Sequence, residues 1–193
     1  MKKGWIILIV VVALVALWGV SAYNGLVKKE ETVKQAWAQV ENQYQRRADL
    51  IPNLVSTVKG YASHESETLE GVTAARARAT SVTVDPANLT PEAIAEYQAA
   101  QGELSQALGR LLMITENYPD LKANQNFLEL QAQLEGTENR ISVERKRFNE
   151  TVQVYNTSIR RFPTNLFAGM FGFEPNGYFE AAEGTETAPV VQF

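Results

Sequence analysis

The stretch Gly4–Val27, GWIILIVVVALVALWGVSAYNGLV, contains 24 residues and no charge. A helix of this length, at about 1.5 Å per residue, measures about 36 Å, whereas the hydrocarbon core of a bilayer is about 30 Å thick. Trp5, Trp18 and Tyr23 lie towards its two ends, where amphipathic rings prefer the membrane interfaces. The stretch therefore predicts a membrane anchor formed by residues 1–27.

A cleavable signal peptide is the alternative interpretation of the same stretch. Val20, Ser21 and Ala22 resemble the small-residue site at which such peptides are cut, and the start of the chain is short and basic. The apolar run is nevertheless longer than the usual core of a signal peptide, and it continues towards Tyr23. The sequence favours a retained anchor and leaves cleavage open.

The lysines that flank the apolar stretch bear on the side of the membrane that holds the rest of the chain. Lys2 and Lys3 precede the stretch and Lys28 and Lys29 follow it, so the positive-inside rule gives no clear preference. Short N-terminal tails readily stay in the cytoplasm. We therefore expect a single-pass protein whose large domain is exported.

The composition of the remaining 166 residues limits the classes of function. They hold 16 of the 18 basic residues and all 22 acidic residues, a net charge of −6. A net acidic domain argues against nucleic acid as a partner, because nucleic acid requires a basic face. The chain has no cysteine, which excludes disulfides, thiolate metal sites and a lipid anchor on an N-terminal cysteine.

Apolar residues after the anchor follow a seven-residue repeat typical of a helix. The stripe begins at Val33, Trp37, Val40 and Tyr44 and continues, in the same phase, as far as Ala79. This spacing predicts one long helix over 26–80, bent at Pro52 because proline lacks the N–H that the turn before it requires. A break near residues 60–63 is the alternative.

Two further helices follow a loop predicted over residues 81–89. Thr90 is a good N-cap with Pro91 behind it, and we expect this helix to end near Asn117. Asp120 is then expected to cap a last helix that ends at Pro163. No segment alternates with period two. We predict an all-α fold in which the transmembrane helix leads into a long-helix antiparallel bundle over 28–163.

Several charged side chains occupy apolar positions of these stripes. Charges in a core are costly unless they are paired, so we expect salt bridges between helices that fix the register. A polar ligand pocket inside the bundle and an active site are the alternatives. The residues concerned are Arg47, Glu65 and Arg76 on the first stretch and Glu138, Glu144 and Arg145 on the last.

Two asparagines lie seven residues apart on the last predicted helix. Asn149 and Asn156 follow Phe148 and Tyr155, so their side chains share one face. We expect buried amides that hydrogen-bond to a neighbouring helix, with direct recognition of a partner as the alternative. In the first helix Pro52 leaves a carbonyl near Ala48 without its donor, which Asn53 or an arginine could supply.

The C-terminal part is rich in aromatic residues and glycines. Residues 164–180 include Phe171 and Phe173, and such a segment must be covered. It either packs across the end of the bundle or contacts the bilayer or a partner subunit. Residues 181–193 are expected to form a flexible tail that adds to a partner's sheet edge or groove.

The sequence lacks the residues that common catalytic and metal sites require. His64 is the only histidine and has no glutamate three residues before it, which makes a carboxylate di-iron centre very unfavourable. We expect His64 in a helix turn or at the surface rather than as a ligand. No serine lies in a Gly-x-Ser-x-Gly context, and no glycine-rich phosphate loop occurs. We therefore predict no enzymatic activity, no metal and no cofactor.

Several short segments together resemble the LemA family over nearly the whole chain. This resemblance implies a bacterial, membrane-anchored, antiparallel four-helix bundle with no established catalytic activity. It makes Asp49, Pro52, Asn53, Glu116, Tyr118, Pro119, Tyr155 and Pro163 further candidates for structural or interaction roles. The segments are Arg46–Val55 (RRADLIPNLV), His64-Glu65, Glu116–Asn124 (ENYPDLKAN), Phe148-Asn149, Tyr155-Asn156 and Phe162-Pro163, with Gly4–Ile7 and Pro189-Val190 at the ends.

These observations lead to two hypotheses on function. The first is a non-enzymatic scaffold or adaptor of the cell envelope, anchored in the bacterial inner membrane with its large domain on the periplasmic side. It acts through lateral self-assembly into a homo-oligomer or through an envelope protein partner, with membrane lipid around its anchor. The second is a sensor that binds a ligand or lipid at a polar site in the bundle core.

Overall fold

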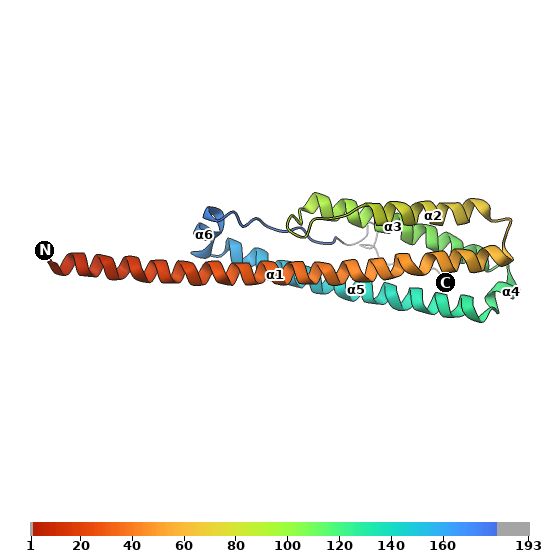
Figure 1. The fold of residues 1–193 in the computed structure, drawn as a ribbon, viewed down its shortest axis with the longest axis horizontal. Coiled ribbons are helices and arrows are strands. Elements are labelled where there is room, and N and C mark those ends of the chain that lie inside the picture. Colours follow the sequence, from red (N-terminus) through yellow and green to blue (C-terminus); the bar gives the residue numbers. More distant parts are fainter. Residues whose placement is uncertain (1, 181–193) are drawn as a thin grey trace, which may run out of the picture.

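The computed structural model describes residues 2–180, and within this range all regular secondary structure is helical (Figure 1). The tail predicted over residues 181–193 lies outside the described residues. The helices are α1 (Lys2–Tyr61), α2 (Ser66–Ser81), α3 (Pro91–Thr115), α4 (Pro119–Lys122), α5 (Gln125–Arg160) and α6 (Thr164–Met170).

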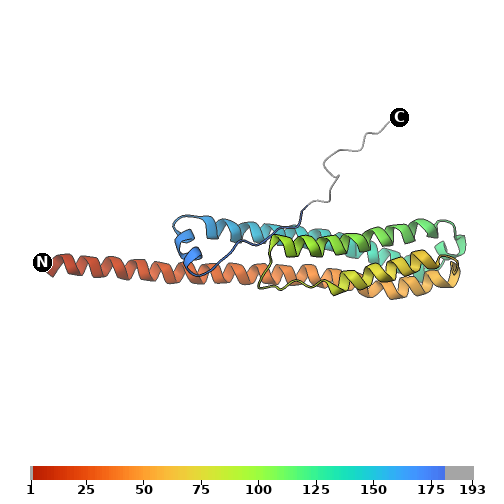
Figure 2. The ribbon, with the colours of Figure 1, turned by 90° about the horizontal axis from the view of Figure 1, so that it is seen from above.

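Helix α1 joins the apolar stretch to the rest of the molecule without interruption. It contains 60 residues, and its first part extends alone beyond the other helices (Figures 1 and 2). The side chains of this part are exposed, with Trp5 69% and Leu17 69% accessible. By length and composition α1 is able to cross a membrane. Burial inside the protein does not explain its apolar surface.

The remaining long helices lie side by side along the second part of α1. Helix α1 contacts α5 and α2, and α2 contacts α3. Successive long helices run in opposite directions, so the loop before α3 and the end of α5 lie towards the apolar part of α1 (Figures 1 and 2). The turns around Ser63 and Ala123 lie at the far end.

The core consists of two hydrophobic clusters stacked along the helix axes. The cluster nearer the apolar stretch, here the proximal cluster, is built around Trp37, Phe148 and Phe179. The distal cluster contains Leu54 and Phe127 among its fully buried side chains. Both clusters draw on α1, α3 and α5, as the apolar stripes require.

The single helix predicted over 26–80 is wrong, and the alternative break near residues 60–63 is confirmed. Helix α1 ends at Tyr61 and α2 begins at Ser66, with Glu65 at its N-cap position. The apolar stripe continued in phase because both segments bury their faces in the same core. α2 folds back against α1, so periodicity alone could not detect the reversal.

The predicted cap of the last helix is also wrong. Asp120 lies inside the one-turn helix α4, and Asn124 instead caps α5 by accepting a hydrogen bond from the Phe127 N–H at 3.0 Å. The cap predicted at Thr90 is confirmed, because its hydroxyl accepts from the Ala93 N–H at 3.2 Å. Both residues satisfy N–H groups that have no partner within their own helix.

Helix α1 continues through Pro52, and a side chain from α2 replaces the missing hydrogen bond. Pro52 has no N–H to donate to the carbonyl of Ala48, four residues before it. The Nε of Arg76 donates to this carbonyl at 2.7 Å. Arg76 therefore ties α2 to the proline turn of α1.

We predict that the effects of substitutions at Arg76 and Pro52 are coupled. Arg76→Met should lower the free energy of unfolding by about 1.5 kcal/mol, the value of a hydrogen bond from a charged donor. In a Pro52→Ala background residue 52 regains its N–H, so the same change should cost less than about 0.5 kcal/mol. Denaturant unfolding of the four proteins measures this coupling. Arg78→Met, which removes an exposed ion pair with Glu103, is the matched control. If the losses at Arg76 and Pro52 were additive, Arg76 would not replace the hydrogen bond that Pro52 lacks.

Candidate functional site

A buried polar layer separates the two hydrophobic clusters. Its centre is Arg47 on α1, which is only 2% exposed. Arg47 Nη1 donates to Ser105 Oγ at 2.7 Å and to Glu138 Oε2 at 3.0 Å, and Nη2 donates to Gln101 Oε1 at 2.8 Å. Gln101 in turn donates to the carbonyl of Ala79 at 3.0 Å. The layer thus links α1, α2, α3 and α5.

The geometry of this layer is that of a filled structural site. Glu138 is half exposed, so it offsets the buried guanidinium while it keeps part of its hydration. Arg47 also lies over the Tyr44 ring, 5.1 Å from its centroid. Gln101 was not singled out from the sequence, although it lies four residues after Tyr97 and three before Leu104. This spacing places Gln101 on the apolar stripe of α3, and it is the signal by which the sequence could have identified Gln101 as buried.

The extended segment after α6 is held by side-chain amides. Asn156 Oδ1 accepts from the N–H of Asn176 at 2.9 Å, and its Nδ2 donates to the carbonyl of the same residue at 2.8 Å. Asn149 contacts Phe179 in the same way, at 2.9 and 2.8 Å. Gln98 on α3 contacts both backbone groups of Glu180. We call these three side chains the amide clamp.

The amide clamp corrects the expectation that the two asparagines bond to a neighbouring helix. Seven residues of helix span about 10.5 Å, and three residues of extended chain span about 10 Å. The spacing of Asn149 and Asn156 therefore matches that of Phe179 and Asn176 in the segment. The spacing of the two asparagines was visible in the sequence. The segment that they bind has no regular secondary structure, so no sequence pattern identified it as their partner.

Close packing fixes the position of the clamped segment. The Phe179 ring is stacked on Trp37, with centroids 5.8 Å apart, and the guanidinium of Arg145 lies over the same ring, 4.8 Å from its centroid. Arg145 also donates to the carbonyl of Glu180 at 2.9 Å. A Cβ at Gly177 would lie 2.6 Å from the Cα of Pro91, so this position has room only for glycine.

Helix α6 and the residues after it pack against the end of the apolar stretch. Phe167 contacts Trp18 edge to face, with centroids 5.1 Å apart, and Tyr23 contacts Phe171 at 5.0 Å and Phe173 at 5.7 Å. The aromatic segment thus covers the end of the bundle nearest the apolar stretch. It also attaches that end to α1.

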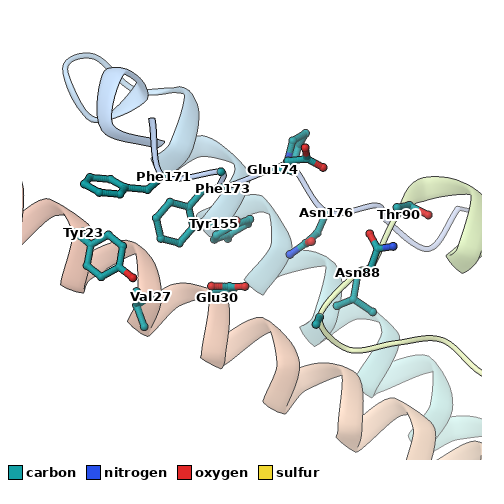
Figure 3. Close-up of a pocket in the computed structure, with 14 residues that line it drawn as sticks. Tyr23, Val27, Glu30, Asn88, Thr90, Tyr155, Phe171, Phe173, Glu174 and Asn176 are labelled. Carbon is teal, nitrogen blue, oxygen red and sulfur yellow. The ribbon is translucent and has the colours of Figure 1, made fainter. Parts of the chain in front are cut away.

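A polar cavity of 270 Å³ lies where the aromatic segment, α1 and α5 meet (Figure 3). Its lining includes Glu30 from α1, Tyr155 from α5, and Glu174 and Asn176 from the segment after α6. Burial raises the pKa of Tyr155 to about 12, and the nearby Glu30 carboxylate adds to this shift. The phenol keeps its proton at physiological pH, as an ordinary tyrosine does, and is available as a hydrogen-bond donor.

The other candidate residues occupy scattered positions away from this cavity. Tyr118 donates to Glu65 Oε1 at 2.9 Å, which raises the pKa of the phenol, and Glu116 pairs with Lys122. Within residues 2–180 no three His, Asp or Glu side chains are grouped to hold a metal ion. Of the remaining candidates, Asp49 accepts from Gln45, Pro119 begins α4, Pro163 precedes α6, and Asn53 and His64 are exposed.

We predict that Arg47 stabilises the bundle far more than its exposed neighbour does. Arg47→Met should lower the free energy of unfolding by about 3 kcal/mol, because Gln101 and Ser105 lose their buried partner. Arg46→Met, next in sequence and exposed, should change it by less than about 0.5 kcal/mol. Thermal unfolding followed by circular dichroism compares the two. Equal losses would show that the polar layer contributes no net stability.

We also predict that the amide clamp controls opening of the C-terminal segment. Asn149→Leu combined with Asn156→Leu removes the hydrogen bonds of both amides while it keeps side-chain size. Hydrogen exchange at the Asn176 and Phe179 amides should accelerate by about ten- to a hundredfold. Asn139→Leu, at an exposed position of the same helix, is the control. Unchanged protection in the double variant would mean that packing of Phe179 alone holds the segment.

Known proteins similar to this chain include curated relatives from several bacteria. Magnetosome protein MamQ 2 of Paramagnetospirillum magneticum is 26% identical over 187 residues, covering 88% of this chain and 68% of the relative. Magnetosome protein MamQ of Magnetospirillum gryphiswaldense is 26% identical over 188 residues, with the same coverage. Protein LemA of Metamycoplasma hominis is 24% identical over 160 residues, covering 83% of this chain and 69% of the relative.

The family comparison covers the part of the chain that forms the polar layer, the amide clamp and the aromatic segment. The model of the LemA family matches residues 36–193, which is more than half of the chain. The resemblance found in the sequence motifs is thereby confirmed, and this chain belongs to the LemA family.

Proposed function

We propose that this protein is a membrane-anchored, antiparallel four-helix bundle that acts as a non-enzymatic scaffold of the bacterial cell envelope. The observation that carries the proposal is the continuity of α1, a single helix from the exposed apolar stretch to the far end of the bundle. A helix does not bend freely, so the bundle is held at a fixed distance and orientation relative to the lipid. Such an arrangement suits a protein that works through contact.

The packing of α6 supports retention of the apolar stretch in the mature protein. Cleavage after Ala22 would remove Trp18 and Gly19, which cover Phe167. It would leave Phe167 without its aromatic contact to Trp18 and without its close contact to Gly19. We therefore propose a retained single-pass anchor in the inner membrane, with the bundle on the periplasmic side.

Lateral contact between copies is the form of assembly that the surface favours. Val143 and Val154 on α5 are 63% and 56% exposed and lie about three helical turns apart on one face. Membrane anchoring places copies at one height with parallel axes, so this face meets its counterpart in register. Arg147 and Glu150, both exposed, lie between the valines and about 4.5 Å apart along the helix, so that Arg147 of each copy can pair diagonally with Glu150 of the other.

The absence of cysteine makes this assembly directly testable. Val154→Cys and Val143→Cys introduce single thiols, and mild oxidation in native membranes should link each variant into dimers. Ser142→Cys, exposed on the same helix but about 100° around it, should link much less. The mass of the extracted particle gives the number of copies. A particle of one chain, with no dimers at either valine, would contradict self-assembly.

The side of the membrane is tested separately. In intact spheroplasts an added protease should cut the loop over residues 81–90 if the bundle is periplasmic. Protection in spheroplasts with cleavage after lysis would place the bundle in the cytoplasm instead.

A further inference from the structure

Helix α6 lies at the level of the lipid if the apolar stretch crosses the membrane, as proposed above. It packs on Trp18 and Gly19, which still belong to the uncharged stretch. A Cβ at Gly19 would lie 2.7 Å from Phe167 Cε1, so the two helices approach closely there. Leu166 and Met170 on the same helix remain 60% and 75% exposed. Such exposure is favourable in acyl chains and unfavourable in water.

An apolar groove runs between α6 and α1 at this level. It has a volume of 310 Å³ and is lined by Ala16, Gly19, Val20, Tyr23, Phe167 and Phe171. Its lining thus combines small or aliphatic residues of α1 with three aromatic rings. The surface of this groove therefore matches a hydrocarbon chain.

The groove borders the polar cavity described above. Tyr23 and Phe171, which Figure 3 shows in the lining of the polar cavity, also line the groove, so the apolar and the polar sites are adjacent. This order, apolar next to the span and polar next to the bundle, is the order of acyl chain and headgroup in a phospholipid. The two sites are placed to hold one such molecule.

The charges of the polar cavity indicate the type of headgroup. Among the described residues that line it, Glu30 and Glu174 are the charged ones, and both are acidic. Lys34 lies outside the lining; its Nζ is 2.8 Å from Glu31 and 3.4 Å from Glu30. Lys34 is paired with Glu30 and Glu31, and the three carboxylates of Glu30, Glu31 and Glu174 outnumber this one ammonium group, so the region of the cavity remains net negative.

Aromatic rings at the same cavity favour a cation further. Tyr23, Phe173 and Tyr155 belong to its lining, and ring faces attract ammonium groups as carboxylates do. We propose that the groove and the cavity together bind one phospholipid with an ammonium headgroup, such as phosphatidylethanolamine. Its acyl chain lies between α1 and α6, and its ammonium group lies between Glu30 and Glu174.

Retention of lipid by the intact protein tests this proposal. The full chain is reconstituted in vesicles of equal phosphatidylethanolamine and phosphatidylglycerol, extracted in mild detergent and weighed by native mass spectrometry. We expect one bound phosphatidylethanolamine, about tenfold enriched over phosphatidylglycerol, as loss of a charge-assisted hydrogen bond implies. Equal retention of both lipids would overturn the proposal.

Two sets of variants test the two halves of the site. Glu30→Gln with Glu174→Gln should abolish the preference for phosphatidylethanolamine, whereas Glu41→Gln, at an exposed position of α1 outside the lining, should preserve it. Ala16→Leu fills the groove and should reduce retention of any lipid, whereas Ala13→Leu on the same span should not. Circular dichroism confirms that each variant keeps its helix content. Equal lipid retention in a filled-groove variant and its control would overturn the acyl-chain site.

Two further arms distinguish a bound lipid from a soluble ligand and from loss of the anchor. Glycerophosphoethanolamine is the same headgroup without acyl chains, and at equal concentration it should not displace the lipid. Displacement would identify a soluble ammonium ligand and overturn the proposed lipid site. Flotation with the vesicles tests the anchor itself. A chain that does not float contradicts the proposed anchoring, whereas one that floats without lipid preference contradicts this inference alone.

Discussion

The physical constraint on which this structure depends is that one helix serves two environments. The first part of α1 exposes most of its apolar side chains, and its second part buries a single stripe against α2, α3 and α5. No turn separates the two, so the register of the bundle is coupled to the position of the apolar stretch. The aromatic segment reinforces this coupling because it contacts α1 at the transition, through Tyr23.

Polar interactions within the bundle specify the arrangement of helices that apolar contacts leave open. Heptad stripes of leucine and valine allow several registers. In the observed register Arg47 meets acceptors on both α3 and α5. In the same register Arg76 reaches the free carbonyl of Ala48. These side chains occupy the boundary between the two clusters, where a wrong register would leave a buried charge without a partner.

The sequence was sufficient for the parts of the fold that repeat locally. The apolar stretch, the Thr90 cap and the stripes of α3 and α5 all follow from residues near one another in the chain. The turn at residues 62–65 did not follow from the local pattern, because the apolar stripe of α2 continues the seven-residue repeat of α1 without a shift. The amide clamp and the polar cavity were also missed, since both arise when residues 171–180 return to α1, α3 and α5 across long separations in sequence.

The amide clamp has an evolutionary consequence. Asn149, Asn156 and Gln98 bond to main-chain atoms of residues 176–180, which every amino acid other than proline provides. Relatives can therefore replace most side chains of this segment and still keep it in place. Selection should act most strongly on two positions of this segment. Gly177 has no room for a side chain, and the ring of Phe179 stacks on Trp37. Side chains elsewhere in the segment can therefore vary and change the surface that it exposes, while its position is kept.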